Sequence, residues 1–217
     1  VEPGTHTLGS AADNAIVLAT GPAHLGTVTS SEGRLSIAPA ADSGVAVPAP
    51  DATRVDIEPG RSSIEFLERG ERRALRVRDA QASTRLQFAG IERFPVDARW
   101  RVEARFEAHP EGRTIDIANV TGSHDPTPNP CRLHFEIDGQ PFSLEAVEGT
   151  PTQLFLIIAD RTSGRETYGA GRFVYVDLSV DGRTVIDFNL AYNPPCAFTE
   201  FSTCPLPPPE NRLDTAV

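Results

Sequence analysis

The stretch LHFEIDGQPFSLEAV, residues 133–147, has the pattern of two strands joined by a tight turn. Apolar side chains alternate with polar ones from Leu133 to Ile137, and a second apolar stretch follows from Pro141 to Val147. Such alternation buries one face of a strand and leaves the other face in water. The dipeptide Asp138-Gly139 between the two halves is a strong hairpin signal, because both residues tolerate the positive φ that a type I′ turn requires. This stretch predicts an antiparallel sheet.

The same pattern continues on both sides of this hairpin in the second half of the chain. A buried strand is expected over residues 153–159, where residues 154–159 are all apolar, and Asp181-Gly182 repeats the hairpin signal. Further strands are expected over residues 100–106, 113–120, 171–178 and 183–188, and a loop is expected over residues 122–130.

The first half of the chain also indicates short strands, with turn signals at short intervals. A turn is expected at Glu58-Pro59-Gly60-Arg61 and a hairpin turn at Arg69-Gly70-Glu71. Closely spaced turns between short alternating segments are typical of a sandwich or barrel. Strands are expected over residues 5–8, 15–18, 25–29, 34–38, 44–47, 54–57, 63–69 and 74–77.

The pattern changes over residues 83–100, where Gly90 and Pro95 interrupt any regular element. We place a domain junction there, with one domain over residues 1–90 and the other over 91–217. The fold class is predicted as all-β, with an N-terminal sandwich of short strands packed on a C-terminal antiparallel barrel-like or sandwich half. We expect extensive contact between the two, with the sole tryptophan, Trp100, as an anchor.

Composition narrows the range of functions. The formal net charge of −10 repels nucleic acids and anionic membranes, so neither is an expected partner. No lysine is present, which excludes Schiff-base chemistry. No run approaches the ~18 apolar residues that span a bilayer. The sequence opens V-E-P-G without a methionine, so we expect a trimmed form of a longer protein, from which a signal peptide could have been lost. A cytoplasmic location is expected.

Two polar segments are candidates for a ligand site. Residues 160–172 connect two predicted strands and contain Arg165, Tyr168 and Arg172 among glycines and hydroxyls. Glycine lets a backbone amide approach a ligand, and arginine pairs with carboxylate or phosphate. The segment is not a P-loop, because no G-K-[ST] follows. An alternative interpretation is an ordered turn with Arg172 paired to Asp160 or Glu166.

The second segment, residues 187–212, lacks helical or strand periodicity and is rich in proline. Side chains must hold such a segment in place, and irregular segments held in this way often build sites. Asp and Asn in loops also cap turns, which is the competing interpretation. The candidate ligand-binding residues of this segment are Asp187, Asn189, Tyr192 and Asn193.

The three cysteines leave several states open. Cys196 and Cys204 could form a bridge, share a metal or remain buried and reduced. Cys131 and His134 would complete a zinc set with them, but residues three apart on a strand point to opposite faces. We therefore expect no metal. No cofactor is indicated by these residues.

Several motifs resemble a known family. They are GRETYGAGRF (164–173), DFN (187–189), AYNPPCAF (191–198) and CPLPPPENRL (204–213). They closely resemble the bacterial and archaeal family called domain of unknown function 1684, and the likeness extends upstream over most of the chain. The resemblance is compatible with a pocket at these motifs and names no ligand.

The N-terminal residues PGTHTLGS (3–10) and DNAIVL (13–18) are similar to the early strands of a forkhead-associated sandwich. Ser10 stands where that family has a phosphate-facing arginine, and Gly21-Pro22-Ala23-His24 replaces its serine-containing loop. The resemblance therefore implies a fold but not phosphothreonine binding.

The leading hypothesis is a polar pocket for a small, anionic ligand, walled by residues 160–172 and 187–212 and either binding or hydrolytic. The rival hypothesis is a non-catalytic protein interaction module that uses the forkhead-like N-terminal sandwich. A third possibility is that the proline-rich segment is purely architectural. No oligomeric state is predicted.

Overall fold

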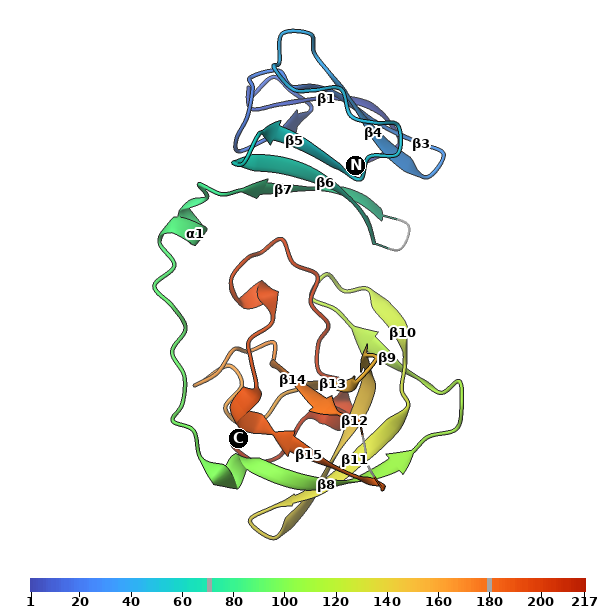
Figure 1. Cartoon of the computed structure of the whole chain (residues 1–217), viewed down its shortest axis with the longest axis vertical. Coiled ribbons are helices and arrows are strands. Elements are labelled where there is room, and N and C mark those ends of the chain that lie inside the picture. Colours follow the sequence, from blue (N-terminus) through green and yellow to red (C-terminus); the bar gives the residue numbers. More distant parts are fainter. Residues whose placement is uncertain (70–71, 179–180) are drawn as a thin grey trace. The chain divides into compact units, whose positions relative to one another are not determined.

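The computed structural model describes residues 1–69, 72–178 and 181–217, and the chain divides into two compact units (Figure 1). These units are Val1–Ile91 and Glu92–Val217, and each is described by itself. The expected contact between the two halves stays a prediction. The turn predicted at Arg69-Gly70-Glu71 lies outside the described residues.

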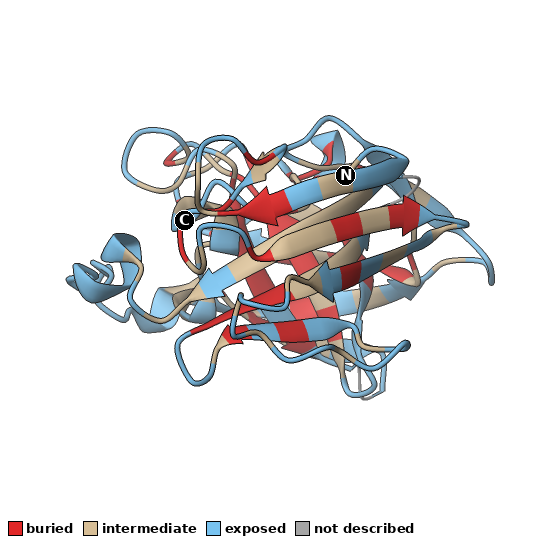
Figure 2. Cartoon of the chain, turned by 90° about the horizontal axis from the view of Figure 1, so that it is seen from above, coloured by how far each residue is buried: buried red, intermediate tan, exposed pale blue. Residues whose placement is uncertain are grey.

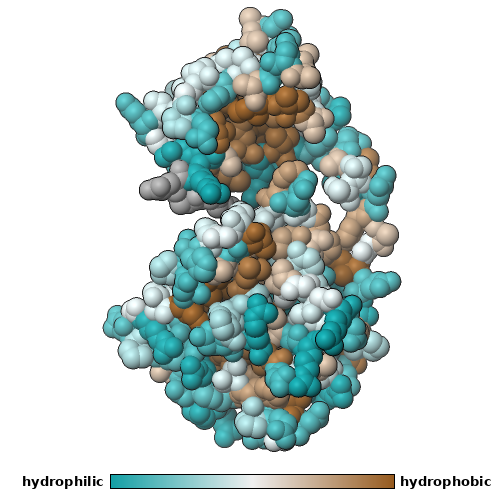
Figure 3. Space-filling view, turned by 180° about the vertical axis from the view of Figure 1, so that it is seen from behind, coloured by the Kyte–Doolittle hydropathy of each residue, from teal (hydrophilic) through white to brown (hydrophobic). Residues whose placement is uncertain are grey.

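The N-terminal unit contains two sheets whose apolar faces share one core. Leu8, Leu25 and Val28 come from the first sheet and its connections, and Ile64 comes from the second; all four are fully buried. A space-filling view shows part of the apolar material of this unit as a recessed patch with a hydrophilic rim (Figure 3). One sheet has the order β2-β1-β3-β4, built from β1 (Gly4–Gly9), β2 (Ile16–Val17), β3 (Gly26–Ser31) and β4 (Arg34–Pro39), and the other has the order β5-β6-β7, built from β5 (Arg54–Glu58), β6 (Ser62–Arg69) and β7 (Arg72–Asp79).

The strand expected over residues 44–47 was wrong. Residues 44–47 have no regular structure, Gly44 has a φ of +72°, and Val47 is 82% exposed. Pro48 and Pro50 follow directly, and proline has no N–H to donate to a sheet ladder. Val45 nevertheless packs against the core. The alternation of apolar residues therefore marked a segment that buries a side chain without pairing with another strand.

The C-terminal unit is a nearly closed antiparallel barrel with the strand order β14-β13-β12-β11-β8-β15. The all-β prediction is therefore confirmed, and the C-terminal half is a barrel. A short helix, α1 (Ser83–Leu86), precedes the unit, and the 3-10 turn η1 (Ala98–Trp100) begins it. The barrel strands are β8 (Arg101–Ala108), β11 (Cys131–Ile137), β12 (Gln140–Thr150), β13 (Gln153–Ile158), β14 (Arg172–Asp177) and β15 (Arg183–Asp187).

Each of the six strands contributes buried residues to the interior of the barrel. Buried residues alternate with less buried ones along β11, and Figure 2 shows bands of buried residues on the strands. Asp138 and Gly139 both have positive φ, at 51° and 75°, and join β11 to β12 as predicted. The second Asp-Gly turn precedes β15, which pairs with β8, whereas β14 pairs with β13. That turn thus links the two edge strands of the barrel sheet. Trp100 packs against this core.

Residues 122–130 were expected to be a loop, and this prediction was wrong. They contain β10 (His124–Pro128), which pairs with β9 (Thr114–Ala118) in a separate two-stranded sheet. Pro126 and Pro128 made this segment look like a loop in the sequence, but an edge strand tolerates residues that cannot donate a hydrogen bond. Ile117 of β9 joins a second apolar cluster with Val147, Ile157, Phe173 and Cys204.

Short 3-10 turns interrupt the C-terminal segment: η2 (Phe188–Leu190), η3 (Pro195–Ala197) and η4 (Pro209–Asn211). Among the described residues, no helix has the length and apolar character needed to cross a membrane.

Candidate functional site

Residues 160–172, the connection, and residues 187–212, the tail, lie side by side. The Tyr168 hydroxyl donates a hydrogen bond to the Cys196 carbonyl at 3.0 Å. The backbones of Phe173 and Tyr192 exchange two hydrogen bonds, of 2.9 and 3.0 Å. A Cβ added at Gly171 would lie 2.5 Å from Cγ of Pro207, so the backbone is closely covered there. The expected proximity of these segments is confirmed.

Arg172 is committed to an internal ion pair. Its side chain is 9% exposed and that of Asp160 is 0% exposed, and Nη2 of Arg172 lies 2.7 Å from Oδ2 of Asp160. Arg172 also donates to the Val217 carbonyl at 2.9 Å, and the Val217 N–H donates to Asp160 at 2.7 Å. Burial lowers the pKa of Arg172, and Asp160 opposes that shift. Of the two interpretations of this arginine, the structure favours the Asp160 pair.

Asp187 and Asn189 hold the start of the tail in place. Asp187 Oδ1 accepts hydrogen bonds from the backbone N–H of Asn189 at 3.0 Å and from its side-chain amide at 2.8 Å. Asn189 also exchanges two hydrogen bonds with the backbone of Asp97, both at 3.0 Å. These side chains cap η2 and fasten the segment before η1 to the barrel, so their polar groups already have partners.

Tyr192 belongs to a group of aromatic rings that holds the tail, whereas Tyr168 reaches the tail through its hydroxyl. Tyr192 meets Phe173 edge to face, at 5.7 Å between ring centroids, and stacks on Tyr175 at 6.3 Å. Burial raises the pKa of Tyr192 to about 12, with Tyr175 as a second cause. Hydrogen bonding at Cys196, with burial, raises the pKa of Tyr168 to about 12. Both phenols are therefore neutral hydrogen-bond donors at physiological pH.

Arg165, Asn193 and Tyr192 are the candidates that face outward. Arg165 is exposed, Asn193 is half-buried, and Tyr192 is 41% exposed. The Arg165 backbone N–H donates to Thr162 O at 3.0 Å, which fixes the turn that presents this guanidinium. The role of these three residues in ligand binding stays a prediction.

The three cysteines are free thiols. The Cys196 N–H donates to Sγ of Cys204 at 3.2 Å, so these two cysteines of the tail are neighbours that do not form a disulfide. Burial raises the pKa of Cys204 to about 11 and that of Cys131 to about 12. Thiols with such pKa values are poor nucleophiles and poor metal ligands at neutral pH.

Cys131 and His134 point to opposite faces of β11, as the strand period predicts. Cys131 is fully buried in the barrel, whereas Nε2 of His134 lies 2.6 Å from Oε2 of Glu107. Among the described residues, no group of three or more His, Cys, Asp and Glu side chains is placed to hold a metal.

A buried carboxylate cluster was missed by the sequence analysis. Glu145 is 2% exposed on β12, yet its carboxylate lies 2.7 Å from His109 Nε2 and 2.5 Å from Arg132 Nη2. Burial alone raises the pKa of Glu145, but hydrogen bonds from His109, Arg132 and Asn129 outweigh it, so the net pKa is lowered. The polar residue Glu145 within an apolar strand was the one available signal.

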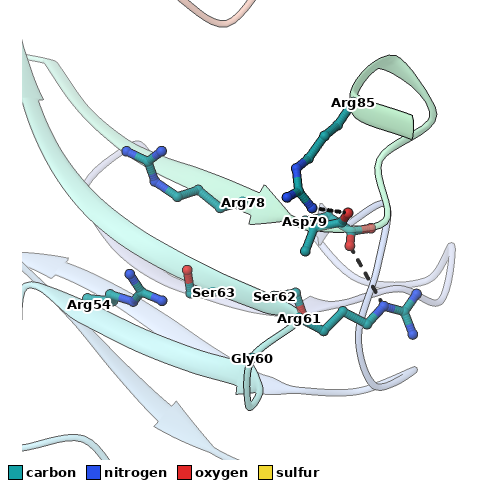
Figure 4. Close-up of a pocket in the computed structure, with 9 residues that line it drawn as sticks. Arg54, Gly60, Arg61, Ser62, Ser63, Arg78, Asp79 and Arg85 are labelled. Carbon is teal, nitrogen blue, oxygen red and sulfur yellow. Dashed lines mark hydrogen bonds and ion pairs between the residues drawn. The ribbon is translucent and has the colours of Figure 1, made fainter. Parts of the chain in front are cut away.

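Two cavities lie in the N-terminal unit. The larger, the arginine cavity, has a volume of about 430 Å³, and the other about 360 Å³. The arginine cavity extends over β5, β6 and β7 and the start of α1 (Figure 4). Its polar lining includes Arg54, Arg61, Ser63, Arg78, Asp79 and Arg85. The sequence analysis did not find it, because its arginines come from four separate elements.

The forkhead-like end of the N-terminal unit has few free groups. The Ser10 hydroxyl donates to the Gly21 carbonyl at 2.9 Å, so it closes a loop. His24 lies 3.9 Å from Asp13, and both side chains are exposed. This arrangement agrees with the absence of the phosphate-facing arginine noted above.

Comparison with known proteins places the chain in a family. A family model described as a protein of unknown function, DUF1684, matches residues 86–217. The chain belongs to the DUF1684 family. The solution NMR structure of an uncharacterised protein from Haloarcula marismortui is similar to this DUF1684 protein, with 32% sequence identity and a TM-score of 0.51. The match covers 61% of this chain and 76% of the archaeal chain. No curated protein matches this DUF1684 protein.

Proposed function

We propose that the C-terminal unit binds a small polar ligand, with a preference for an anion, where the connection meets the tail. The hydrogen bond of 3.0 Å between Tyr168 and Cys196 is the observation that supports this proposal most directly. It fastens a glycine-rich turn to an irregular proline-rich segment, and rigid irregular segments of this kind present backbone and side-chain groups to ligands.

The candidate residues divide into two roles. Arg165 is the cation that would meet the anion, because Arg172 is occupied by Asp160 at 2.7 Å. Tyr192 and Asn193 would add hydrogen bonds at the edge. The remaining candidates act as positioning residues: Tyr168 joins the two segments, Arg172 holds the connection through Asp160, and Asp187 with Asn189 holds the start of the tail.

Binding without reaction is favoured over hydrolysis. A general base that works at neutral pH needs a pKa close to 7. The pKa values of Tyr168 and Tyr192 are raised to about 12, and that of Cys204 to about 11. These groups stay protonated, so they do not accept a proton from a ligand, and Tyr192 is the one of them that would donate a hydrogen bond to it.

Thermal unfolding with acetate, succinate or citrate tests the proposal. Trp100 is the sole tryptophan and lies in the C-terminal unit, so its fluorescence reports on that unit. A ligand at 100 times its Kd stabilises the folded state by about 2.7 kcal/mol. We expect at least one carboxylate to raise the melting temperature and Arg165→Gln to abolish the rise. Arg161→Gln is the matched control, because Arg161 is an exposed neighbour paired to Asp214 at 2.8 Å. No rise with any carboxylate, or equal loss in both variants, would contradict the proposal.

A second candidate function is an interaction module in the N-terminal unit. The arginine cavity supports it, because four arginines line one hollow of this small unit. Substitutions in the cavity should then weaken partner binding and leave the Trp100-detected stability of the C-terminal unit unchanged.

A further inference from the structure

We propose that the arginine cavity binds a small phosphate monoester. This site lies in the N-terminal unit and is independent of the ligand proposed for the C-terminal unit. Four arginines and a buried serine line this hollow (Figure 4).

The strand register brings the central groups together. Ser63 on β6 pairs directly with Arg78 on β7, and on its other side it pairs with Asp56 on β5. Arg54 lies two residues before Asp56, so it projects from the same face of the sheet as Ser63 and Arg78. Ser63 is 2% exposed and lines the cavity from the strand between those that carry Arg54 and Arg78.

Two further arginines approach from the end of the sheet. Arg61 follows the turn between β5 and β6, where it lies 2.9 Å from Glu58 and 3.7 Å from Asp79. Arg85 belongs to α1 and donates to the Ala80 carbonyl at 2.7 Å, which draws this helix toward the cavity. The cations therefore come from several sides of the hollow.

The existing ion pairs leave donors for a ligand. A guanidinium has five N–H donors. Arg78 uses Nε and Nη2 for Glu65, at 2.7 and 3.0 Å, so its Nη1 remains. Arg85 uses Nη1 for a neutral carbonyl, so its other N–H groups remain for a ligand. The carboxylates hold the arginines extended, which reduces the entropy lost when they bind.

The charge and size of the cavity select the ligand class. Asp79 is the only carboxylate that lines the cavity beside the four arginines, and Asp56, Glu58 and Glu65 pair with those arginines from outside it. A carboxylate presents two oxygens in one plane, whereas a phosphate presents three or four in tetrahedral directions, which suits donors on several sides. A volume of about 430 Å³ lies within the range of about 300–1,000 Å³ typical of small-ligand sites and leaves room for an organic substituent.

Titration of the full chain with O-phosphoserine, and separately with inorganic phosphate, tests this proposal. Calorimetry measures the Kd, and amide NMR shifts locate the site. We expect saturable binding of phosphoserine with shifts on β5, β6 and β7. Equal Kd values for the two probes would assign recognition to the phosphate group, whereas tighter binding of phosphoserine would assign part of it to the ester. Serine without phosphate should not bind.

Variants separate a built site from general attraction by basic residues. Arg78→Gln and Arg85→Gln should each raise the Kd about tenfold to a hundredfold, since each removes a charge-assisted hydrogen bond. Arg72→Gln is the matched control, because Arg72 is exposed on the same strand and does not line the cavity. Equal weakening in all three variants would overturn the proposal, as would the absence of binding by both phosphate probes to the wild type. Amide spectra of each variant establish that the unit remains folded.

Discussion

The side chain of Asn211 completes the backbone hydrogen bonding of Glu145. Its Oδ1 accepts from the Glu145 N–H at 2.7 Å, and its Nδ2 donates to the Glu145 carbonyl at 2.8 Å and to the Ile157 carbonyl at 3.0 Å. The ladder between β12 and β13 begins at Val147 and Phe155. Glu145 and Ile157 lie just outside this ladder, where the two strands are no longer paired directly. The buried side-chain amide of Asn211 bridges them there.

Replacement of Asn211 by alanine should strongly destabilise the C-terminal unit. Three buried backbone groups would lose their partners, and each unsatisfied group costs about 1–3 kcal/mol. We expect a loss of about 3 kcal/mol or more in the free energy of unfolding, measured by urea denaturation with Trp100 fluorescence. Glu210→Ala changes an exposed neighbour and should alter stability by about 0.5 kcal/mol or less. Similar losses in both variants would contradict this account.

The ion pair between Arg172 and Asp160 should show strong coupling in a double-mutant cycle. Removal of one partner leaves the other charge buried and unpaired, at a cost of about 3–5 kcal/mol. We expect Arg172→Met and Asp160→Asn together to cost much less than the sum of the single variants. The exposed pair Arg161–Asp214 provides the comparison, with an expected coupling of about 0–1 kcal/mol. Equal coupling in the two cycles would show that burial does not strengthen the Arg172 pair.

Stability should fall in acid because of Glu145. Its pKa in the folded protein is lowered from 4.5, so its contribution is complete above that value and is lost as the pH falls through the lowered pKa. Below pH 4.5, the unfolding free energy of Glu145→Gln should therefore decline less steeply than that of the wild type. Glu210→Gln should keep the wild-type slope. If the free energy of unfolding falls equally steeply in acid for Glu145→Gln and the wild type, groups other than Glu145 cause the acid sensitivity.

Gly171 should be the least replaceable glycine of the connection. Its φ is +91°, and an added Cβ would collide with the Ile158 carbonyl and with Pro207. Gly112 has a φ of +78° but open space around it. Gly112→Ala should cost about 1–2 kcal/mol from backbone strain alone. Gly171→Ala should cost several kcal/mol in thermal unfolding experiments, and the difference measures the clash with the tail.

The sequence predicted the features that depend on local chemistry. Asp138-Gly139 occupies a tight turn between β11 and β12, because both residues accept positive φ. Val47 shows the limit of this approach, because an alternating pattern cannot tell a paired strand from an irregular segment that buries one side chain. The prolines of β10 show the opposite error, in which a local penalty conceals an edge strand.

The fate of the polar residues depended on long-range contacts. Whether Arg172 meets a ligand or Asp160 is decided by burial, to which Val217 contributes through a hydrogen bond across 45 residues. The Glu145–His109 pair joins residues 36 apart in the sequence. In the arginine cavity, the register of β5, β6 and β7 brings Arg54 and Arg78 to one face of the sheet, and Arg61 and Arg85 join them from the turn and from α1.

The pairing of β8 with β15 has a consequence for synthesis on the ribosome. Arg105 of β8 pairs with Arg183 of β15, so the barrel sheet lacks this edge strand until the later residue has left the exit tunnel. Until then β8 presents an unpaired edge, and open edges of this kind invite association between nascent chains. The N-terminal unit does not depend on such a late strand, because all of its strands end by Asp79. Chaperones that engage this protein during translation should therefore act on the barrel strands.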